Sequence, residues 1–309
     1  MGWILLGLGA GIGSPMMTAS NTRLKNKYNG NAFYAARFSY LTSFVILSII
    51  LAMTGTGFSM PWSVMADEPG WIWIGGICGI YYQAFLAMVM PRLGSIQTMI
   101  FSIVGQVMTG MTIDHFGFFK TNVNSVTGVR LAGAALVLAG AVFLSLTKAS
   151  SAAASEKAEG LSAWLWRLFS VSTGCVSACQ TAINGQLGKL AESPLKASCY
   201  SFFTGFVCLV IICLLFSLRS GGMKAEPGLK PYWMWLGGVF GILYNLTSIL
   251  LSIRMGTGLA VLILLTGIMI GGVILEQFGL FEVKRQPVNA FKMGCILMML
   301  AGLAMIRLL

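Results

Sequence analysis

Long apolar segments alternate with short polar connections along almost the whole chain. Each apolar segment is close to the roughly 20 residues that an α-helix needs to cross the hydrocarbon core of a bilayer. Helices are expected because a spanning segment must satisfy its backbone hydrogen bonds internally. The pattern therefore predicts an all-α integral membrane protein with ten transmembrane helices. The predicted spans are 2–22, 33–54, 71–90, 95–113, 126–146, 164–186, 196–217, 233–251, 257–275 and 292–308.

One long stretch of the sequence occurs twice. The segment Trp71–Phe119 returns without gaps as Trp233–Phe281, 162 positions later. A repeat of this length, which keeps its register through two apolar segments, predicts a tandem duplication of a membrane unit. The identical pairs include Trp71/Trp233, Gly75/Gly237, Tyr82/Tyr244, Gly94/Gly256, Gly105/Gly267, Gly117/Gly279 and Phe119/Phe281.

The duplication divides the chain into two units of five predicted spans. Residues 1–146 form the first unit, residues 147–163 a linker rich in Ala, Ser, Lys and Glu, and residues 164–309 the second unit. Because five is an odd number, the second unit must enter the membrane upside down relative to the first. The sequence thus predicts two five-helix repeats of inverted topology.

Composition agrees with a membrane protein, since 57% of the 309 residues are hydrophobic and only 9% are charged. The net charge of +11 lies in short loops, so it sets topology and does not indicate nucleic-acid binding. The basic loops place the linker in the cytoplasm and both termini outside. The side expected to be cytoplasmic carries Arg23, Lys25, Lys27, Arg92, Lys148, Lys157, Arg167, Arg219, Lys224, Lys230, Lys284, Arg285 and Lys292.

Residues that could support catalysis or metal binding are sparse. The seven cysteines include no CxxC pair, and the single histidine, His115, stands beside Asp114 at the end of the fourth predicted span. The repeat places Glu276 and Gln277 at the equivalent positions. We therefore expect no enzyme activity, no catalytic or metal site and no cofactor. An interfacial pair is the simpler interpretation of Asp114 and His115, and a role in gating or proton coupling stays open.

Neutral polar side chains are the better candidates for a binding site. Ser95, Thr98, Ser102, Gln106 and Thr109 share one face of a predicted helix, whereas the equivalent positions of the second unit are mostly apolar. Each such group could simply bond a neighbouring helix, for about 0.6 kcal/mol. As a set, they predict a central polar cavity. The substrate-binding candidates are Gln83, Gln106, Asn184, Asn245, Tyr82, Tyr244, Asn21 and Ser102.

The sequence resembles the drug/metabolite transporter superfamily, and more narrowly its YdcZ-like branch in the fused ten-span form. The resemblance covers nearly the whole chain. The second unit departs from it at Gly267-Ile268, where the glutamine is missing. The residues that carry the resemblance are Asn21-x-x-Leu24, the WIWIGGICG and WMWLGGVFG openings, Pro91-Arg92-Leu93-Gly94, Gly105-Gln106 and Ile113-Asp114-His115-Phe116-Gly117.

The resemblance implies a carrier of the bacterial cytoplasmic (inner) membrane that works by alternating access. The small multidrug resistance relatives use a glutamate in their first span, which this chain lacks. We expect a secondary transporter, an exporter of a small polar or amphipathic metabolite, that functions in the lipid bilayer and can act as a monomer because its halves are fused. The alternatives are a flippase for a lipid or lipid-linked intermediate, for which Arg37 is the candidate in-span charge, and a non-transporting membrane assembly factor.

Overall fold

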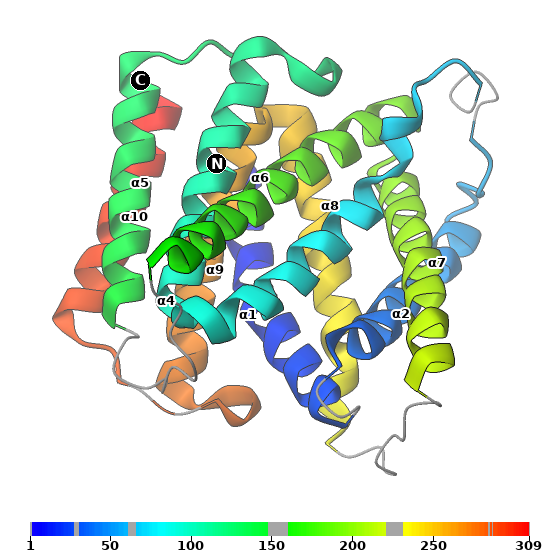
Figure 1. Ribbon diagram of the computed structural model, residues 1–309. Coiled ribbons are helices and arrows are strands. Elements are labelled where there is room, and N and C mark those ends of the chain that lie inside the picture. Colours follow the sequence, from blue (N-terminus) through cyan, green and yellow to red (C-terminus); the bar gives the residue numbers. More distant parts are fainter. Residues whose placement is uncertain are drawn as a thin grey trace.

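The computed structural model describes residues 2–27, 31–60, 66–147, 160–220, 231–283, 285 and 287–308, and every regular element in these ranges is a helix (Figure 1). The α-helices are α1 (Gly2–Lys27), α2 (Ala32–Met53), α4 (Gly75–Phe116), α5 (Gly128–Thr147), α6 (Gly160–Leu190), α7 (Pro194–Ser220), α8 (Gly237–Met255), α9 (Thr257–Phe278) and α10 (Ala290–Leu308). The 3-10 helices are η1 (Gly70–Trp73), η2 (Phe118–Lys120), η4 (Tyr232–Leu236) and η5 (Leu280–Glu282). The all-α class predicted from the sequence is confirmed.

The surface and the helix lengths are those of a membrane protein. Five helical stretches in the described residues are long and apolar enough to cross a bilayer, namely Gly2–Lys27, Ala32–Met53, Pro194–Leu218, Tyr232–Met255 and Thr257–Phe278. Large apolar side chains also point outward, with Leu5 66%, Met53 81% and Leu218 75% exposed. A water-soluble protein rarely exposes so much continuous apolar surface, whereas lipid solvates it without cost.

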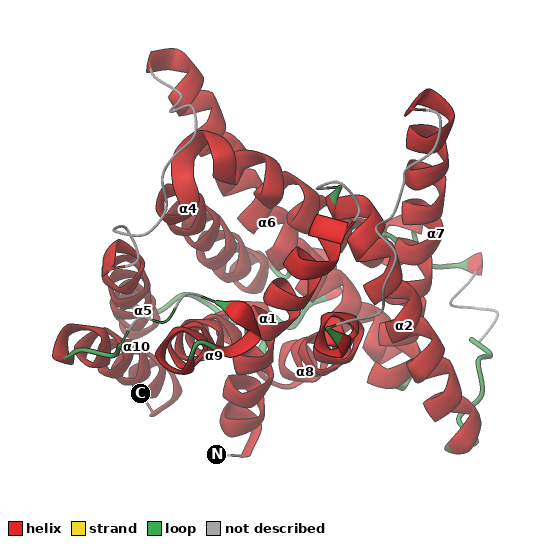
Figure 2. Cartoon of the chain, turned by 90° about the horizontal axis from the view of Figure 1, so that it is seen from below, coloured by secondary structure: helices red, strands yellow, loops and turns green. Residues whose placement is uncertain are grey.

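Two outer helix pairs flank an inner group of helices. α5 packs against α10 at one edge and α2 against α7 at the other, and α1, α4, α6, α8 and α9 lie between them (Figures 1 and 2). α9 is the most enclosed of the inner helices, because sixteen of its 22 residues are buried. Its sequence is apolar on all sides, as expected for a helix surrounded by others.

α4 differs from the sequence prediction. Separate helices over 71–90 and 95–113 were expected, but one helix of 42 residues runs from Gly75 to Phe116. Figure 1 shows that it turns sharply near its middle, so that a first arm (residues 75–90) and a second arm (residues 95–116) cross the molecule separately. The sequence between the two arms contains Pro91 and Gly94. Proline weakens the helix there because it lacks an N–H donor, and glycine because it has no side chain to restrict the backbone.

α6 lies between the two arms of α4. Tyr81 of the first arm contacts Ser172, and Ser170 donates a hydrogen bond to the carbonyl of Thr98 in the second arm. α6 begins at Gly160, four residues earlier than the sequence predicted, and residues 148–159 of the predicted linker lie outside the described residues.

Equivalent helix crossings in the two halves use the same residues. A Cβ atom on Gly75 would collide with the Asn184 side chain, and one on Gly237 would meet Oδ1 of Asn21 at 2.5 Å. Each half therefore packs its first helix against the third-helix segment of the other half. The shared glycines permit a close approach that a larger residue would prevent.

The aromatic residues shared by the repeats pair with each other. The rings of Trp71 and Phe119 meet edge-on at 5.3 Å, and those of Trp233 and Phe281 at 5.1 Å. Each phenylalanine itself has a positive φ angle, +57° for Phe119 and +55° for Phe281, and stands two residues after a glycine that also does, Gly117 or Gly279. A left-handed turn of this kind favours glycine, which explains why the glycine recurs in both copies.

Candidate functional site

Four of the candidate residues meet where the two halves join. Tyr82 and Ser102, on the two arms of α4, lie near each other, and Tyr244 of α8 lies near Gln106. Tyr82 and Tyr244 are also neighbours across the two halves. We call Tyr82, Ser102, Gln106 and Tyr244 the central cluster. It draws on both halves of the chain, so a ligand bound here would contact both.

α6 supplies polar partners that the sequence analysis missed. Gln106 donates from Nε2 to Oγ of Ser177 at 2.9 Å, and the hydroxyl of Thr173 donates to Ser102 at 3.1 Å. A signal for them is present in the sequence, because hydroxyl side chains recur at three- and four-residue spacing along this helix and so share one face. They are Ser170, Thr173, Ser177 and Thr181.

The other candidates lie elsewhere. Asn21 and Asn184 occupy the two glycine crossings, where Asn21 accepts a hydrogen bond from Ser39. Asn245 is buried, and its Oδ1 atom has no hydrogen-bond partner within the described part of the chain. Gln83 follows Tyr82 on α4 and is half-buried. A buried amide oxygen without a partner is costly, which makes Asn245 a candidate to bond a ligand or water.

A cavity of about 760 Å³ opens between the second arm of α4 and α6. We call it the α4–α6 groove. Its volume is in the range of pockets that hold small molecules. The lining is mostly apolar and aromatic, with two threonines, two cysteines and one lysine: Trp71, Gly105, Met108, Thr109, Thr112, Ile113, Phe118, Phe119, Lys120, Val171, Cys175 and Cys179. Gly105 directly precedes Gln106 in the sequence, but none of the four residues of the central cluster lines the groove.

The equivalent helix pair in the other half is tightly closed. A Cβ atom on Gly267 of α9 would lie 2.5 Å from the carbonyl oxygen of Leu8 in α1, and one on Gly271 would lie 2.5 Å from that of Ile12. In the first half, Gly105 packs on Val171 in the same way, but the position equivalent to Gly271 is Thr109, which lines the groove. The first half therefore has a groove at Thr109, whereas the second half is closely packed at the equivalent Gly271.

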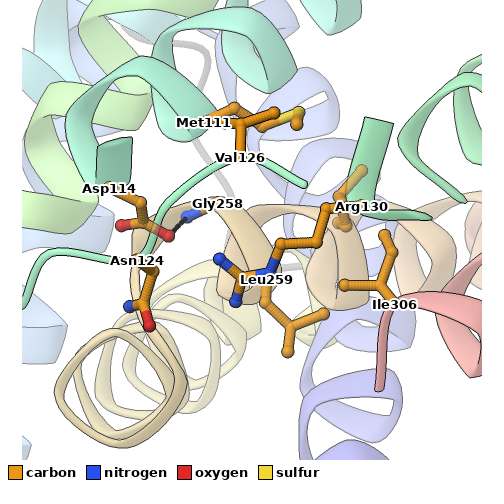
Figure 3. Close-up of a pocket in the computed structure, with 9 residues that line it drawn as sticks. Met111, Asp114, Asn124, Val126, Arg130, Gly258, Leu259 and Ile306 are labelled. Atoms are coloured by element: carbon orange, nitrogen blue, oxygen red, sulfur yellow. Dashed lines mark hydrogen bonds between the residues drawn. The ribbon is translucent and has the colours of Figure 1, made fainter. Parts of the chain in front are cut away.

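Asp114 joins the end of α4 to the beginning of α9. Its Oδ1 accepts a hydrogen bond from the backbone N–H of Thr257 at 2.7 Å, and its Oδ2 accepts one from Gly258 at 2.8 Å. A carboxylate here satisfies N–H groups that have no partner within the helix and interacts favourably with the helix dipole. Figure 3 shows Arg130 reaching from α5 toward the small cavity that Asp114 lines.

The charged and polar residues around Asp114 recur in the second half. Lys292, which is equivalent to Arg130, donates to Oε2 of Glu276 at 3.3 Å, and both side chains are largely buried. The imidazole Nδ1 of His115 accepts a hydrogen bond from the backbone N–H of Val126 at 3.3 Å. His115 therefore fixes a turn of the chain. Among the described residues, no group of three or more His, Cys, Asp and Glu side chains is placed to hold a metal ion.

The in-span charge Arg37 has aromatic neighbours on its own helix. Its guanidinium lies 5.2 Å from the ring centroids of both Tyr34 and Phe38. Cation–π contacts of this kind stabilise an arginine in an apolar setting. The position lies on α2, away from the residues that line the α4–α6 groove.

Comparison with known proteins identifies the family. The family model described as "Putative inner membrane exporter, YdcZ" matches residues 2–143 and again residues 165–305. The two matched ranges fall within the two predicted units. No curated protein matches the sequence. Of 28 solved chains that match the structure, one crystal structure described only as a protein covers 96% of both chains with a TM-score of 0.69. Its identity is 12%, so it shows the shared fold alone.

The matched ranges cover nearly the whole chain, and the helices have the length and apolar surface of membrane spans. These observations place the protein in the inner membrane with several crossings and give it a general role in transport. The chain belongs to the YdcZ family of inner-membrane exporters, within the drug/metabolite transporter group.

Proposed function

We propose that the protein is a secondary transporter that exports a small polar or amphipathic metabolite by alternating access. The substrate binds at the central cluster and reaches it through the α4–α6 groove. The observation that carries this proposal is the contrast between the two equivalent helix pairs. α4 and α6 part at Thr109, whereas α9 and α1 are in contact at Gly271.

If the halves are inverted repeats, this contrast means that the protein is accessible from one face of the membrane only. The end of the second arm of α4 and the end of α9 then lie at opposite faces of the membrane. One face is open to the centre while the other is closed. The two arms of α4, together with α1, α2 and α5 to α10, supply the ten membrane crossings. Both chain ends lie toward the upper side of Figure 1, whereas α5 ends nearer the lower side, which supports an odd number of crossings in the first repeat.

The distribution of basic residues among the loops indicates which side of the protein faces the cytoplasm. Basic residues concentrate on the side of the linker, which is therefore cytoplasmic, and both termini are outside. The α4–α6 groove ends at Lys120, on the outer side, so the proposed state faces outward. Because one chain supplies both orientations, a monomer has all the parts of the cycle.

The chemistry of the path defines the substrate class. Gln106, Ser102 and the two tyrosine hydroxyls can donate and accept hydrogen bonds, and the tyrosine rings offer apolar surface. The groove adds aromatic and aliphatic walls. These features suit a neutral or weakly charged metabolite with an apolar part.

The proposal is tested by binding and then by transport. Purified protein is screened for thermal stabilisation by metabolite classes, and each stabilising compound is measured by counterflow in proteoliposomes. Gln106→Leu should abolish both the shift and the counterflow. Thr22→Val is the matched control, since the Thr22 hydroxyl donates to the carbonyl of Thr18, one turn earlier in α1. Counterflow that is unchanged in Gln106→Leu would show that the site is elsewhere.

A second candidate function is favoured by the rim of the groove. Met108 and Phe118 line the groove and are 62% and 52% exposed. An apolar rim of this kind would let a lipid tail enter from the bilayer, as a flippase requires. The same proteoliposomes distinguish the functions: a flippase moves a fluorescent lipid between leaflets and shows no counterflow of water-soluble metabolites.

A further inference from the structure

A second group of polar side chains lies between α6 and α8, beside the central cluster. The hydroxyl of Ser248 on α8 donates to Oγ1 of Thr181 on α6 at 3.3 Å, and both side chains are buried. One turn earlier on α6, Ser177 accepts a hydrogen bond from Gln106, a residue of the central cluster. The two polar groups are therefore one turn of α6 apart.

The crossing of α6 and α8 brings Asn245 to the same place. A Cβ atom on Gly185 of α6 would lie 2.5 Å from Oγ of Ser252, one turn beyond Ser248 on α8. Asn245 precedes Ser248 by three residues, so these two and Ser252 share the face of α8 that meets α6. The helix geometry thus places Asn245 next to the pair formed by Ser248 and Thr181.

The amide oxygen of Asn245 has unused acceptor capacity. Asn245 is only 8% exposed, and its Oδ1 atom has no hydrogen-bond partner within the described part of the chain. A buried carbonyl oxygen is costly unless a donor or a cation meets it. Such an atom points to an occupant that supplies either a hydrogen-bond donor or a positive charge.

The spacing of the two hydroxyl oxygens suits a cation better than a hydrogen bond. O–H···O bonds usually span about 2.5–3.0 Å, so the 3.3 Å between Ser248 and Thr181 is long. Oxygen ligands lie about 2.4 Å from Ca²⁺, and Na⁺ is an ion of nearly the same size. Two ligands at right angles around such an ion are therefore about 3.4 Å apart. The hydroxyls have the spacing of neighbouring Na⁺ ligands.

The hydroxyl oxygens also have lone pairs to offer. Thr181 donates its own hydrogen to the carbonyl oxygen of Ser177 at 3.2 Å. The hydrogen of Ser248 can rotate away from Thr181, because a hydroxyl carries one donor and two acceptor lone pairs. Both oxygens can then coordinate an ion together with Oδ1 of Asn245. Hard cations prefer oxygen ligands of this kind.

We propose that Thr181, Asn245 and Ser248 bind a sodium ion between α6 and α8, with water completing its coordination. The ligands are neutral, so oxygen dipoles hold the ion and a modest affinity, on the order of 1 mM, is expected. An ion that occupies this place in alternation with substrate would supply the energy for export. That coupling, unlike the ion site itself, rests on the proposed function.

The site is tested by thermal unfolding of the purified protein while Na⁺ or K⁺ replaces choline at constant ionic strength. Na⁺ should raise the unfolding temperature in a saturable manner, because an ion that binds only the folded state stabilises it. Thr181→Val and Asn245→Leu should each raise the half-saturating Na⁺ concentration at least about tenfold, a loss that even indirect changes to metal ligands produce.

Thr266→Val is the matched control. Thr266 is also buried, and its hydroxyl also donates to the carbonyl oxygen four residues earlier, that of Leu262, but it lies on α9. This variant should keep the Na⁺ response of the parent protein. Thr181→Ser retains the hydroxyl oxygen and should keep it as well. Size-exclusion elution and unfolding in choline confirm that each variant is folded.

The outcomes separate the ion site from the proposed function. The site is overturned if Na⁺ has no effect, if K⁺ acts as strongly as Na⁺, or if Thr181→Val and Asn245→Leu respond like the parent protein. Metabolite counterflow that is the same with and without Na⁺ would overturn the coupling and leave the proposed transport standing. A Na⁺ response that both variants lose, in a protein without counterflow, would support the ion site and contradict the proposed transport.

Discussion

The imidazole of His115 bonds the backbone N–H of Val126, and Gln277 does the same for Val288 162 residues later, through Oε1 at 2.6 Å. The two halves thus use different side chains to accept a hydrogen bond from the equivalent backbone N–H group. A neutral imidazole nitrogen and an amide oxygen are both acceptors, which explains how the histidine can be absent from the second copy without loss of the turn.

His115→Gln is therefore expected to preserve both stability and transport, because the amide restores the acceptor. His115→Leu removes the acceptor and should lower the free energy of unfolding by about 0.5–1.5 kcal/mol. Thermal unfolding in detergent and counterflow measure the two properties. Loss of transport in the glutamine variant would instead indicate that the imidazole carries protons.

Gly11 and Gly9 of α1 should respond oppositely to alanine. A Cβ atom on Gly11 would lie 2.5 Å from the carbonyl oxygen of Leu264 in α9, whereas one on Gly9 would meet nothing within 4 Å. Gly11→Ala should destabilise the protein by about 1–3 kcal/mol through overpacking. Gly9→Ala should be neutral or stabilising by up to about 1 kcal/mol, since alanine favours helix. Equal effects on the unfolding temperature would contradict the α1–α9 contact.

The Gln106–Ser177 hydrogen bond predicts coupled effects on stability. Gln106→Ala and Ser177→Ala should each destabilise the protein, and the double variant should cost less than their sum. The coupling free energy is expected to be about 0.6 kcal/mol, the average for such bonds between membrane helices. A double-mutant cycle of unfolding free energies measures it, and strict additivity would show that the two side chains do not interact.

Lys120 bonds Glu68 at 2.8 Å and lines the groove, with 54% of its side chain exposed. Because solvent screens an exposed pair, Lys120→Met should change the free energy of unfolding by less than about 1 kcal/mol. If the substrate carries a negative group, the same variant should raise the KM of counterflow while its kcat is nearly unchanged. A large loss of thermal stability would show that the pair has a structural role.

Much of the fold follows from local sequence. Uninterrupted apolar segments predict helices because the bilayer offers the backbone no other hydrogen-bond partner. The duplication could be predicted because Trp71, Gly75 and Phe119 recur at one spacing. The structure explains why these residues are kept in both copies. They form the ring contacts and close crossings on which each half depends.

The candidate site was predictable in part. Tyr82, Ser102, Gln106 and Tyr244 do come together, but Asn21 and Asn184 pack against glycines at the helix crossings. The central cluster and the helix crossings both accommodate a polar side chain inside the membrane, so residue type alone does not distinguish them. Sequence spacing places a residue on a helix face, yet it does not identify the helix that this face meets.

The sequence by itself determined the helical class, the two related halves and the family. Tertiary structure alone decided that α4 is continuous while α8 and α9 are separate, that Thr109 lines an open groove while Gly271 is packed, and that Asp114 caps α9. These features depend on contacts between helices far apart in the chain. Two related repeats can take different conformations because such contacts, not local propensity, set the position of each helix.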